Sequence, residues 1–393
     1  MRGAADSMFT AVHLALREML RNWTRYLLFS LVVALITVLV LFVAALGSGL
    51  LGGISEYFEA LDADLLVYQD TARRVASSSR VGCDARGAIR NVDGVRDVGG
   101  LAFSSVSIVQ GESADLLDIS LVGVEPGKPG EPPVVAGQGL RRKQAREAII
   151  DGNVAQLLGL QPGDRFTVST VQGGSEEFYT LRVLGISESL RYNLSPSVFV
   201  PLAAWDEIRP KALVTAPEED PACNVVAVQL DDPTQIEAMS TLVQGRVENI
   251  EAVDPTTAYE SQPGYTSIRS SLAIQRTFAL LISGLVIGGF FQIQTLQKVP
   301  QIGMLKAIGT PNHVVALATL IEILLTMVAG VAIASPLMLG IASSFPASVP
   351  IVFDLRTTAM AVGSIFLMGF LGGLLSIRYS LRVEPLIALG LGA

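Results

Sequence analysis

The sequence predicts an α-helical membrane protein with four transmembrane helices and a large extracytoplasmic α+β domain inserted between the first and second helices. Three observations carry this fold class. Half of the 393 residues are hydrophobic and only 16% are charged. The apolar residues gather in four long segments, and 31 of the 36 acids lie between the first two segments. This balance is too apolar for an ordinary soluble enzyme and too charged for a pure membrane bundle.

The four apolar segments are the predicted spans. They are residues 26–52, 273–297, 314–340 and 357–378. Each has about 20 residues or more, which is enough to cross roughly 30 Å of hydrocarbon as a helix. The first is about twice as long as the apolar core of a signal peptide and lacks a small-x-small cleavage site, so we expect an uncleaved anchor. Pro336 should kink the third span.

Positively biased flanks set the orientation of the spans. Arginines precede the first span in residues 1–25, and Lys298 and Lys306 lie in the loop 298–313. Around the start of the tail 379–393, Arg378 and Arg382 outnumber Glu384. Short loops rich in Lys and Arg face the cytoplasm, so residues 53–272 and the loop 341–356 are assigned outside. Apolar residues at three- and four-residue spacing also predict an amphipathic helix in residues 1–25 that lies in the inner membrane interface.

The outer region 53–272 holds 31 acids and 18 Lys or Arg residues, a net charge of −13. Its two ends read as strand–helix–strand units, and its middle is richer in strands. The first unit comprises 64–69, 84–92 and 95–109, and the last comprises 225–230, 232–244 and 247–253. Between them lie predicted strands at 166–171, 178–186 and 197–200 and a helix at 152–158. We therefore expect an α+β domain with a β-rich insertion.

No constellation for catalysis or cofactor binding stands out. The two histidines, His13 and His313, are both assigned inside, so a His-based triad or zinc site outside is excluded. Outer acids such as Asp151 occupy positions where helix caps and turns favour acids. The chain has no G-x-x-x-x-G-K-[ST] motif, and the G-x-G-x-x-G pattern at 47–52 follows no strand. We expect a protein that is not an enzyme, holds no cofactor or metal, and binds no nucleic acid.

Small-residue pairs and cysteines give structural expectations. Gly284 with Gly288, and Gly369 with Gly373, allow close helix packing within the chain or with a second copy. Cys83 and Cys223 both lie in the outer region, in a compartment that permits disulfides, so their pairing is a hypothesis.

Glu322 lies about two turns into the third span from its cytoplasmic end. An acid at this depth is costly unless it is paired or wet, so it is a candidate functional residue. It could reach the interface with the help of Lys298 or Lys306, or it could have a structural or coupling role. Proton transport is disfavoured, because the other spans offer no partner acid.

Short motifs follow one another along the whole chain. Residues 148–164 contain A-I-I-D-G-N-V-A, L-G-L and P-G-D, residues 302–309 read I-G-M-L-K-A-I-G, and residues 382–389 read R-V-E-P-L-I-A-L. In this order and spacing they resemble the permease subunits of the MacB-like and FtsX-like ABC transporter family, the type VII exporters.

The resemblance implies that residues 298–313 form the coupling helix that contacts a separate ATPase subunit. The matching positions are Gly303, Leu305, Lys306, Ala307, Ile308 and Gly309. Pro300-Gln301 replaces the usual basic–acidic start of this motif, so Lys306 becomes the expected polar contact.

The resemblance also implies a permease homodimer in the bacterial inner (cytoplasmic) membrane, with ATP and Mg²⁺ bound by the ATPase subunits and with an adaptor or partner protein outside. Two functions stay open. One is an exporter that extracts or expels an amphiphilic, lipid or peptide substrate. The other is a mechanotransmitting regulator of an extracytoplasmic partner, such as a cell-wall hydrolase, with no transported substrate.

Overall fold

The computed structural model describes residues 12–13, 15–110, 115–143, 145–211, 223–345 and 349–381. The chain divides into two compact units, which we call the helical unit (Met1–Gly49 and Arg269–Ala393) and the outer unit (Leu50–Ile268). Among the described residues, four helices are long and apolar enough to cross a membrane. They are α2 (Trp23–Ala60), α8 (Tyr265–Gln297), α10 (Asn312–Ser344) and α11 (Leu355–Leu381). The prediction of four spans with an inserted outer domain is confirmed.

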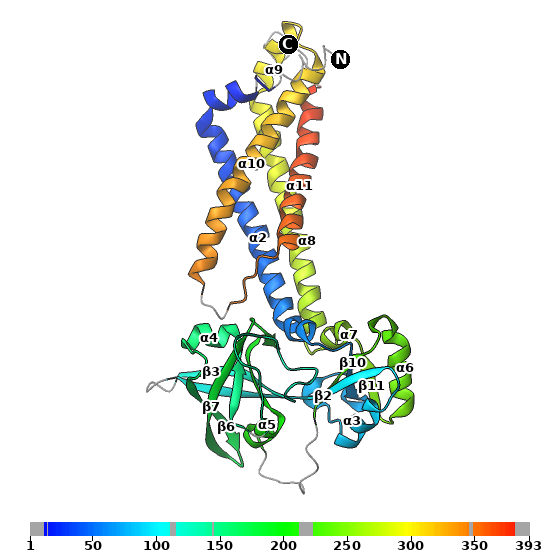
Figure 1. Cartoon of the computed structure of the whole chain (residues 1–393). Coiled ribbons are helices and arrows are strands. Elements are labelled where there is room, and N and C mark those ends of the chain that lie inside the picture. Colours follow the sequence, from blue (N-terminus) through cyan, green and yellow to red (C-terminus); the bar gives the residue numbers. More distant parts are fainter. Residues whose placement is uncertain are drawn as a thin grey trace. The chain divides into compact units, whose positions relative to one another are not determined.

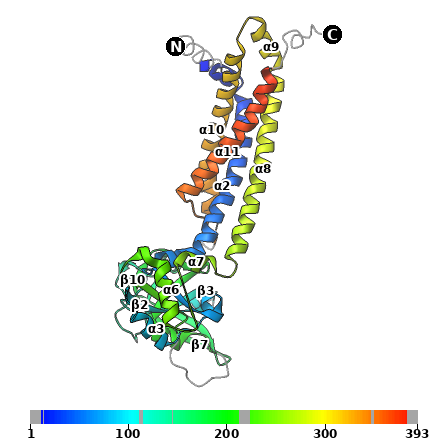
Figure 2. The same cartoon turned by 90° about the vertical axis from the view of Figure 1, so that its right-hand side faces the viewer.

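The long helices lie side by side in both views (Figures 1 and 2). Helix α2 runs on past the expected end of the first span at residue 52, and α8 begins eight residues before the expected start of the second at residue 273. Their ends at residues 50–60 and 265–268 belong to the outer unit. Helix α10 stays continuous through Pro336, as membrane helices allow when neighbouring groups satisfy the freed carbonyl.

The predicted glycine pair of α8 packs against α11. A Cβ atom placed on Gly284 would lie 3.2 Å from the sulfur of Met368, and one on Gly288 would lie 3.6 Å from the Cα of Gly372. Small residues therefore bring the two backbones together at this crossing.

The glycine pair of α11 faces a different neighbour. A Cβ on Gly369 would collide with Met327 of α10, and one on Gly373 would lie 2.8 Å from the side chain of Ile323. Both small-xxx-small pairs thus make contacts between helices of the same chain.

Replacing Gly372 by leucine should separate α8 from α11. A Cβ there would lie 2.7 Å from the Cα of Gly288, and backbone cannot yield as a side chain can. We expect a stability loss of about 1–3 kcal/mol for Gly372→Leu, measured by thermal unfolding of the purified permease in mild detergent. Gly289→Leu is the matched control, because no atom lies within 4 Å of a Cβ at that position. Equal stabilities of the two variants would contradict this helix contact.

The outer unit is built on one sheet of 11 strands. Its order is β11-β1-β10-β2-β3-β9-β5-β7-β4, with β6 pairing β2 and β7, and β8 pairing β9. The strands are β1 (Leu65–Gln69), β2 (Val95–Gln110), β3 (Asp115–Val124), β4 (Val134–Gly137), β5 (Glu147–Ile150), β6 (Arg165–Gln172), β7 (Ser175–Ser187), β8 (Arg191–Tyr192), β9 (Ser195–Pro201), β10 (Val225–Leu230) and β11 (Ile250–Val253). The helices are α3 (Cys83–Arg90), α4 (Gly152–Leu158), α5 (Leu202–Ile208), α6 (Ile236–Arg246) and α7 (Pro255–Glu260).

The two predicted strand–helix–strand units meet at one end of this sheet. They are β1–α3–β2 and β10–α6–β11, and β1 lies between β10 and β11. Ile89 of α3 and Val243 of α6 are fully buried in one hydrophobic cluster with Val226 and Val228 of β10. The 16-residue strand β2 pairs with β10 near its start and with β3 along most of its length, so the β-rich middle extends the same sheet.

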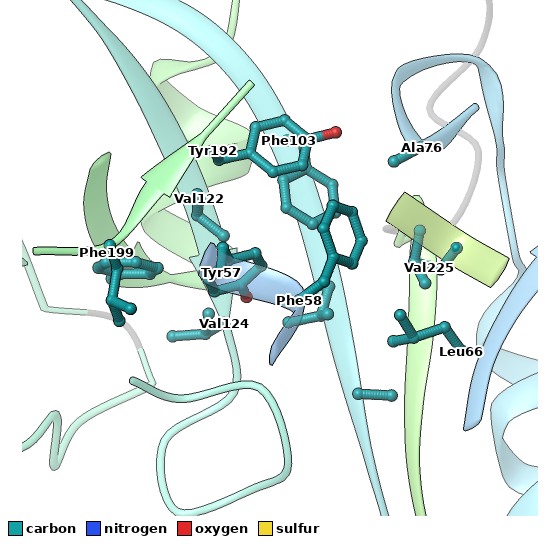
Figure 3. Packing of buried hydrophobic residues seen from close by; sticks show 14 of the residues in the cluster. Tyr57, Phe58, Leu66, Ala76, Phe103, Val122, Val124, Tyr192, Phe199 and Val225 are labelled. Atoms are coloured by element: carbon teal, nitrogen blue, oxygen red, sulfur yellow. The ribbon is translucent and has the colours of Figure 1, made fainter. Parts of the chain in front are cut away.

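Aromatic side chains of the outer unit pack together around residues near the end of α2 (Figure 3). Tyr57 and Phe58, near the end of α2, are each 1% exposed and pack against Phe103, Tyr192 and Phe199. The rings of Phe103 and Tyr192 stack with centroids 4.2 Å apart, and Tyr57 lies 5.5 Å from Phe199. Aromatic side chains bury roughly 150–250 Å² each, so this cluster anchors the end of α2 in the outer core.

Asp151 caps helix α4 and joins it to β9. One carboxylate oxygen accepts the backbone N–H of Val154 at 2.7 Å, and the other accepts that of Ser197 at 2.8 Å. The carboxyl group is fully buried. Burial raises the pKa of Asp151 to about 6, and the hydrogen bonds from Ser197 and Val154 oppose this rise.

Asp151→Asn should lower the stability of the outer unit by about 1–3 kcal/mol, because an amide nitrogen would face one of the two buried N–H groups. The folded pKa of Asp151 lies above the unfolded value, so its stabilising contribution is full below about pH 4 and is lost as the pH rises through about 6. The stability gap between wild type and variant should therefore shrink from pH 4 to pH 7, as measured by denaturation followed by Trp205 fluorescence. A constant gap over this range would contradict the assignment.

Candidate coupling site

Helix α9 (Val299–Ala307) connects α8 to α10 and is the small helix predicted for this loop. Pro300 stands in its first turn, where a proline costs no intrahelical hydrogen bond. The helix ends at Ala307, and Gly309, which follows the C-cap residue Ile308, has a φ of +96° that suits glycine. The next amide, of Thr310, donates to the carbonyl of Leu305 at 3.0 Å. Local chemistry therefore fixes both ends of α9.

One side of α9 is packed and the other is open. Ile302 is 6% exposed and Gly303 is also buried, whereas Met304 is 55% and Ile308 78% exposed. We call the exposed residues of this helix and its end the α9 face; they are Pro300, Gln301, Met304, Ala307 and Ile308. Their spacing of three to four residues places Gln301, Met304 and Ile308 along one side of the helix.

The six predicted coupling residues therefore divide between the two sides. Ala307, Ile308 and Gly309 are exposed, Leu305 and Lys306 are half-buried, and Gly303 is buried. Met304, which is not one of the six predicted residues, is also exposed.

Lys298 is the most connected polar residue beside α9. It is 7% exposed, and its Nζ lies 2.5 Å from Oε2 of Glu322 and 2.8 Å from Oε1 of Glu18. It also donates a hydrogen bond of 2.7 Å to the hydroxyl of Tyr26. We call these four residues the lysine node. The node joins the start of α9 to α10, to α2 and to the helical residues 15–21.

The node keeps its lysine charged although it is buried. Burial by itself lowers the pKa of Lys298, but the nearby Glu322, Tyr26 and Glu18 raise it overall. Glu322 is only 4% exposed, so its carboxylate is buried within the helical unit. Lys298, one of the two lysines expected to assist Glu322, contacts its carboxylate. A buried pair of this kind is sensitive to the loss of either member.

A small cavity lies between α9 and α10. Its volume is about 40 Å³. Its polar lining residues are Glu18, Lys298, Gln301, Thr310, Thr319 and Glu322, and its apolar ones are Ile302, Leu305, Val314, Val315 and Ala318. This volume and these polar groups suit a few water molecules.

Three residues of the candidate coupling site were not predicted from the sequence, namely Glu18, Tyr26 and Met304. Glu18 sits among arginines in a short segment, and Tyr26 reads as an ordinary aromatic residue at the edge of a span. Met304 looked like one apolar residue of a mostly apolar helix. Glu18 and Tyr26 are separated from Lys298 by about 280 and 272 positions, so no local pattern marks them as its partners.

The other predicted sites have separate outcomes. Cys223 is buried, and its thiol donates to the carbonyl of Val81 at 3.5 Å. The side chain of Cys83 lies outside the described residues, so the disulfide stays a prediction. The motif at 382–389 also lies outside them. No group of three or more His, Cys, Asp or Glu residues placed to hold a metal ion occurs in the part of the chain that the structure describes.

Two family profiles match consecutive parts of the chain. The MacB-like periplasmic core domain matches residues 26–246, and the C-terminal part of FtsX-like permeases matches residues 276–385. A protein of Staphylococcus haemolyticus, named as hemin transport system permease protein HrtB, is 23% identical over 383 residues, which is 96% of this chain and 99% of that protein. Its namesake in Staphylococcus epidermidis is 30% identical over 112 residues, covering 28% of this chain and 32% of that protein.

Two solved structures are also similar. The extracellular domain of the noncanonic ABC-type transporter YknZ from Gram-positive bacteria has a TM-score of 0.34 at 18% identity, covering 49% of this chain and all of that domain. The periplasmic region of MacB from Actinobacillus actinomycetemcomitans has a TM-score of 0.35 at 12% identity, covering 53% of this chain and 94% of that region. On the strength of the two profile matches, the chain is a multi-pass membrane protein that belongs to the MacB-like and FtsX-like family of ABC transporter permeases.

Proposed function

We propose that the chain is the permease subunit of an ATP-binding-cassette exporter in a bacterial inner membrane. Two copies would assemble with two copies of a separate ATPase subunit, which holds ATP and Mg²⁺. The observation that carries this proposal is α9. Its face is exposed and apolar at Met304 and Ile308, while its start is tied through Lys298 to three other helical segments. An exposed apolar patch rimmed by polar residues marks a contact with a partner protein.

Motion of the ATPase would enter through the α9 face and leave through the lysine node. A displacement of α9 pulls on Lys298, which passes the force to Glu322 of α10, Tyr26 of α2 and Glu18. Helix α8 moves with α9 because the two are joined at Lys298. Since α2 ends in the aromatic cluster of the outer unit, its motion reaches the extracytoplasmic side.

The substrate is proposed to be an amphiphile captured from the outer leaflet or from outside. Buried polar side chains of the helical unit gather mainly at the end that holds α9; they include Gln294, Thr295, Glu322, Thr326 and Ser376. Such a one-sided arrangement favours extraction over passage through the four helices. The name of the Staphylococcus haemolyticus relative makes hemin, an apolar macrocycle with carboxylates, the first compound to test.

The second candidate function is a lever that activates an extracytoplasmic partner without moving a substrate. Tyr57 and Phe58 are buried in the outer core, so a movement of α2 would be transmitted to the outer unit whether or not a substrate is moved. This burial is compatible with the second function as well as with export.

Affinity purification of the intact complex, with partners identified by mass spectrometry, tests both functions. We expect an ABC ATPase at one copy per permease. An adaptor of the membrane-fusion kind, or hemin sensitivity of a strain without the permease, supports export. A coiled-coil hydrolase without such sensitivity supports the lever. Purification without any ATPase contradicts both functions.

A further inference from the structure

A two-residue turn of the outer unit sits directly against α2. Strands β8 and β9 form a hairpin with the pairs Arg191–Pro196 and Tyr192–Ser195, and Asn193 and Leu194 make its turn. Both turn residues have positive φ, +51° and +68°. This is the pattern of a type I′ hairpin turn, which favours asparagine first and glycine second. Leucine at the second place is held in a conformation that residues with a Cβ rarely adopt.

Contacts with α2 explain what holds Leu194 there. Its backbone N–H donates to the carbonyl of Gly53 at 2.9 Å, and the backbone N–H of Arg191 donates to Oε2 of Glu56 at 3.3 Å. Tyr192, between them, packs its ring against Tyr57 and Phe58 (Figure 3). The hairpin therefore contacts α2 over little more than one helical turn.

Gly53 is the position of α2 that permits this approach. A Cβ placed there would lie 3.0 Å from Cδ2 of Leu194 and 3.6 Å from its Cα. A larger side chain would push the turn away from the helix. The preceding glycine is different, since a Cβ on Gly52 would meet only Oε1 of Glu56, at an ordinary 3.5 Å.

The hairpin is also fixed firmly to the sheet. The hydroxyl of Ser197 in β9 accepts the backbone N–H of Tyr192 at 3.1 Å, and Ser120 of β3 donates its hydroxyl to the carbonyl of Tyr192 at 3.0 Å. Strand β9 pairs with β3 on one side and with β5 on the other. A displacement of α2 at Gly53 would thus be transmitted to the three neighbouring strands β3, β9 and β5.

We propose that the Asn193–Leu194 turn is a clamp that locks α2 at Gly53 to the β3–β9–β5 part of the outer sheet, so that helix and strands move as one body. The clamp deepens the proposed transmission function, on which its purpose rests. Its existence can be tested on the permease alone, without ATPase or substrate, so failure of the clamp and failure of the proposed function are separable.

Hydrogen exchange on the full-length permease in detergent tests the clamp. Gly53→Leu should speed exchange at the Leu194 amide and in residues 191–196 at least tenfold, because the side chain forces the turn off the helix. Gly52→Leu makes the same gain in helix propensity at the neighbouring position and should leave the exchange rate at wild-type level. Equal protection in the two variants would overturn the clamp.

A cysteine pair gives an independent reading if Gly53→Leu fails to fold. In a background with Cys83→Ser and Cys223→Ser, the combination of Gly53→Cys and Leu194→Cys should oxidise readily, since the Cβ of residue 53 points at residue 194. Gly52→Cys with Leu194→Cys should oxidise at least tenfold more slowly. Oxidation at the same rate in both pairs would show that the turn does not contact α2 specifically at Gly53.

Discussion

Lys298→Met should be among the most damaging single substitutions in the helical unit. It removes the cation that contacts both Glu322 and Glu18, and it leaves the buried Glu322, which is 4% exposed, without the Lys298 charge beside it. Breaking a buried ion pair from one side costs about 3–5 kcal/mol, more than replacing the whole pair by apolar groups. We expect a corresponding loss of thermal stability in purified full-length permease.

A double-mutant cycle separates this effect from simple loss of packing. Glu322→Leu in the Lys298→Met background should recover at least half of the lost stability, because no buried charge then stands alone at that point. Glu18 keeps 19% of its side chain exposed and can reach water. Additive losses in the double variant, or a loss below about 1 kcal/mol for Lys298→Met, would contradict the node.

Met304→Asp combined with Ile308→Asp should abolish binding of the ATPase while leaving the permease folded. Both side chains are more than half exposed, so the charges cost the isolated permease little. Buried apolar anchors at the centre of an interface typically contribute about 2 kcal/mol each, or roughly 30-fold in affinity. The readout is the amount of ATPase that co-purifies with each variant.

The matched control lies on the other side of the membrane. Leu242 of α6 is 56% exposed in the outer unit, much like Met304, so Leu242→Asp makes the same chemical change at a surface that should not meet the ATPase. It should leave co-purification unchanged. Undiminished ATPase binding in the double α9 variant would remove the α9 face as the contact.

Much of the fold follows from local pattern. The four spans, the two strand–helix–strand units and helix α4 with its Asp151 cap are visible because length, periodicity and capping residues mark them directly. Strand β3 was not predicted from the sequence. Asp115 and Asp118 interrupt its apolar pattern, and Asp118 is accommodated because it accepts a hydrogen bond of 2.8 Å from Ser107 on the adjacent strand. Strands β4 and β5, with four residues each, are too short to show a period.

The candidate site could likewise be predicted from the sequence only in part. The position and ends of α9 could be predicted, since Pro300 and Gly309 punctuate the segment. Its buried network could not, because Lys298 meets Glu18 and Tyr26 only after the chain has passed through the whole outer domain. Which side of α9 is open also depends on tertiary packing against α10, so the sequence did not single out Met304.

Photo-cross-linking from position 308 in intact membranes tests the central claim that α9 receives the motion of an ATPase. With a photoreactive amino acid in place of Ile308, we predict a product with the combined mass of the permease and an ABC ATPase, and no such product from position 242. A cell that expresses the complex but yields no ATPase adduct from position 308, or yields one from position 242 instead, would contradict the account.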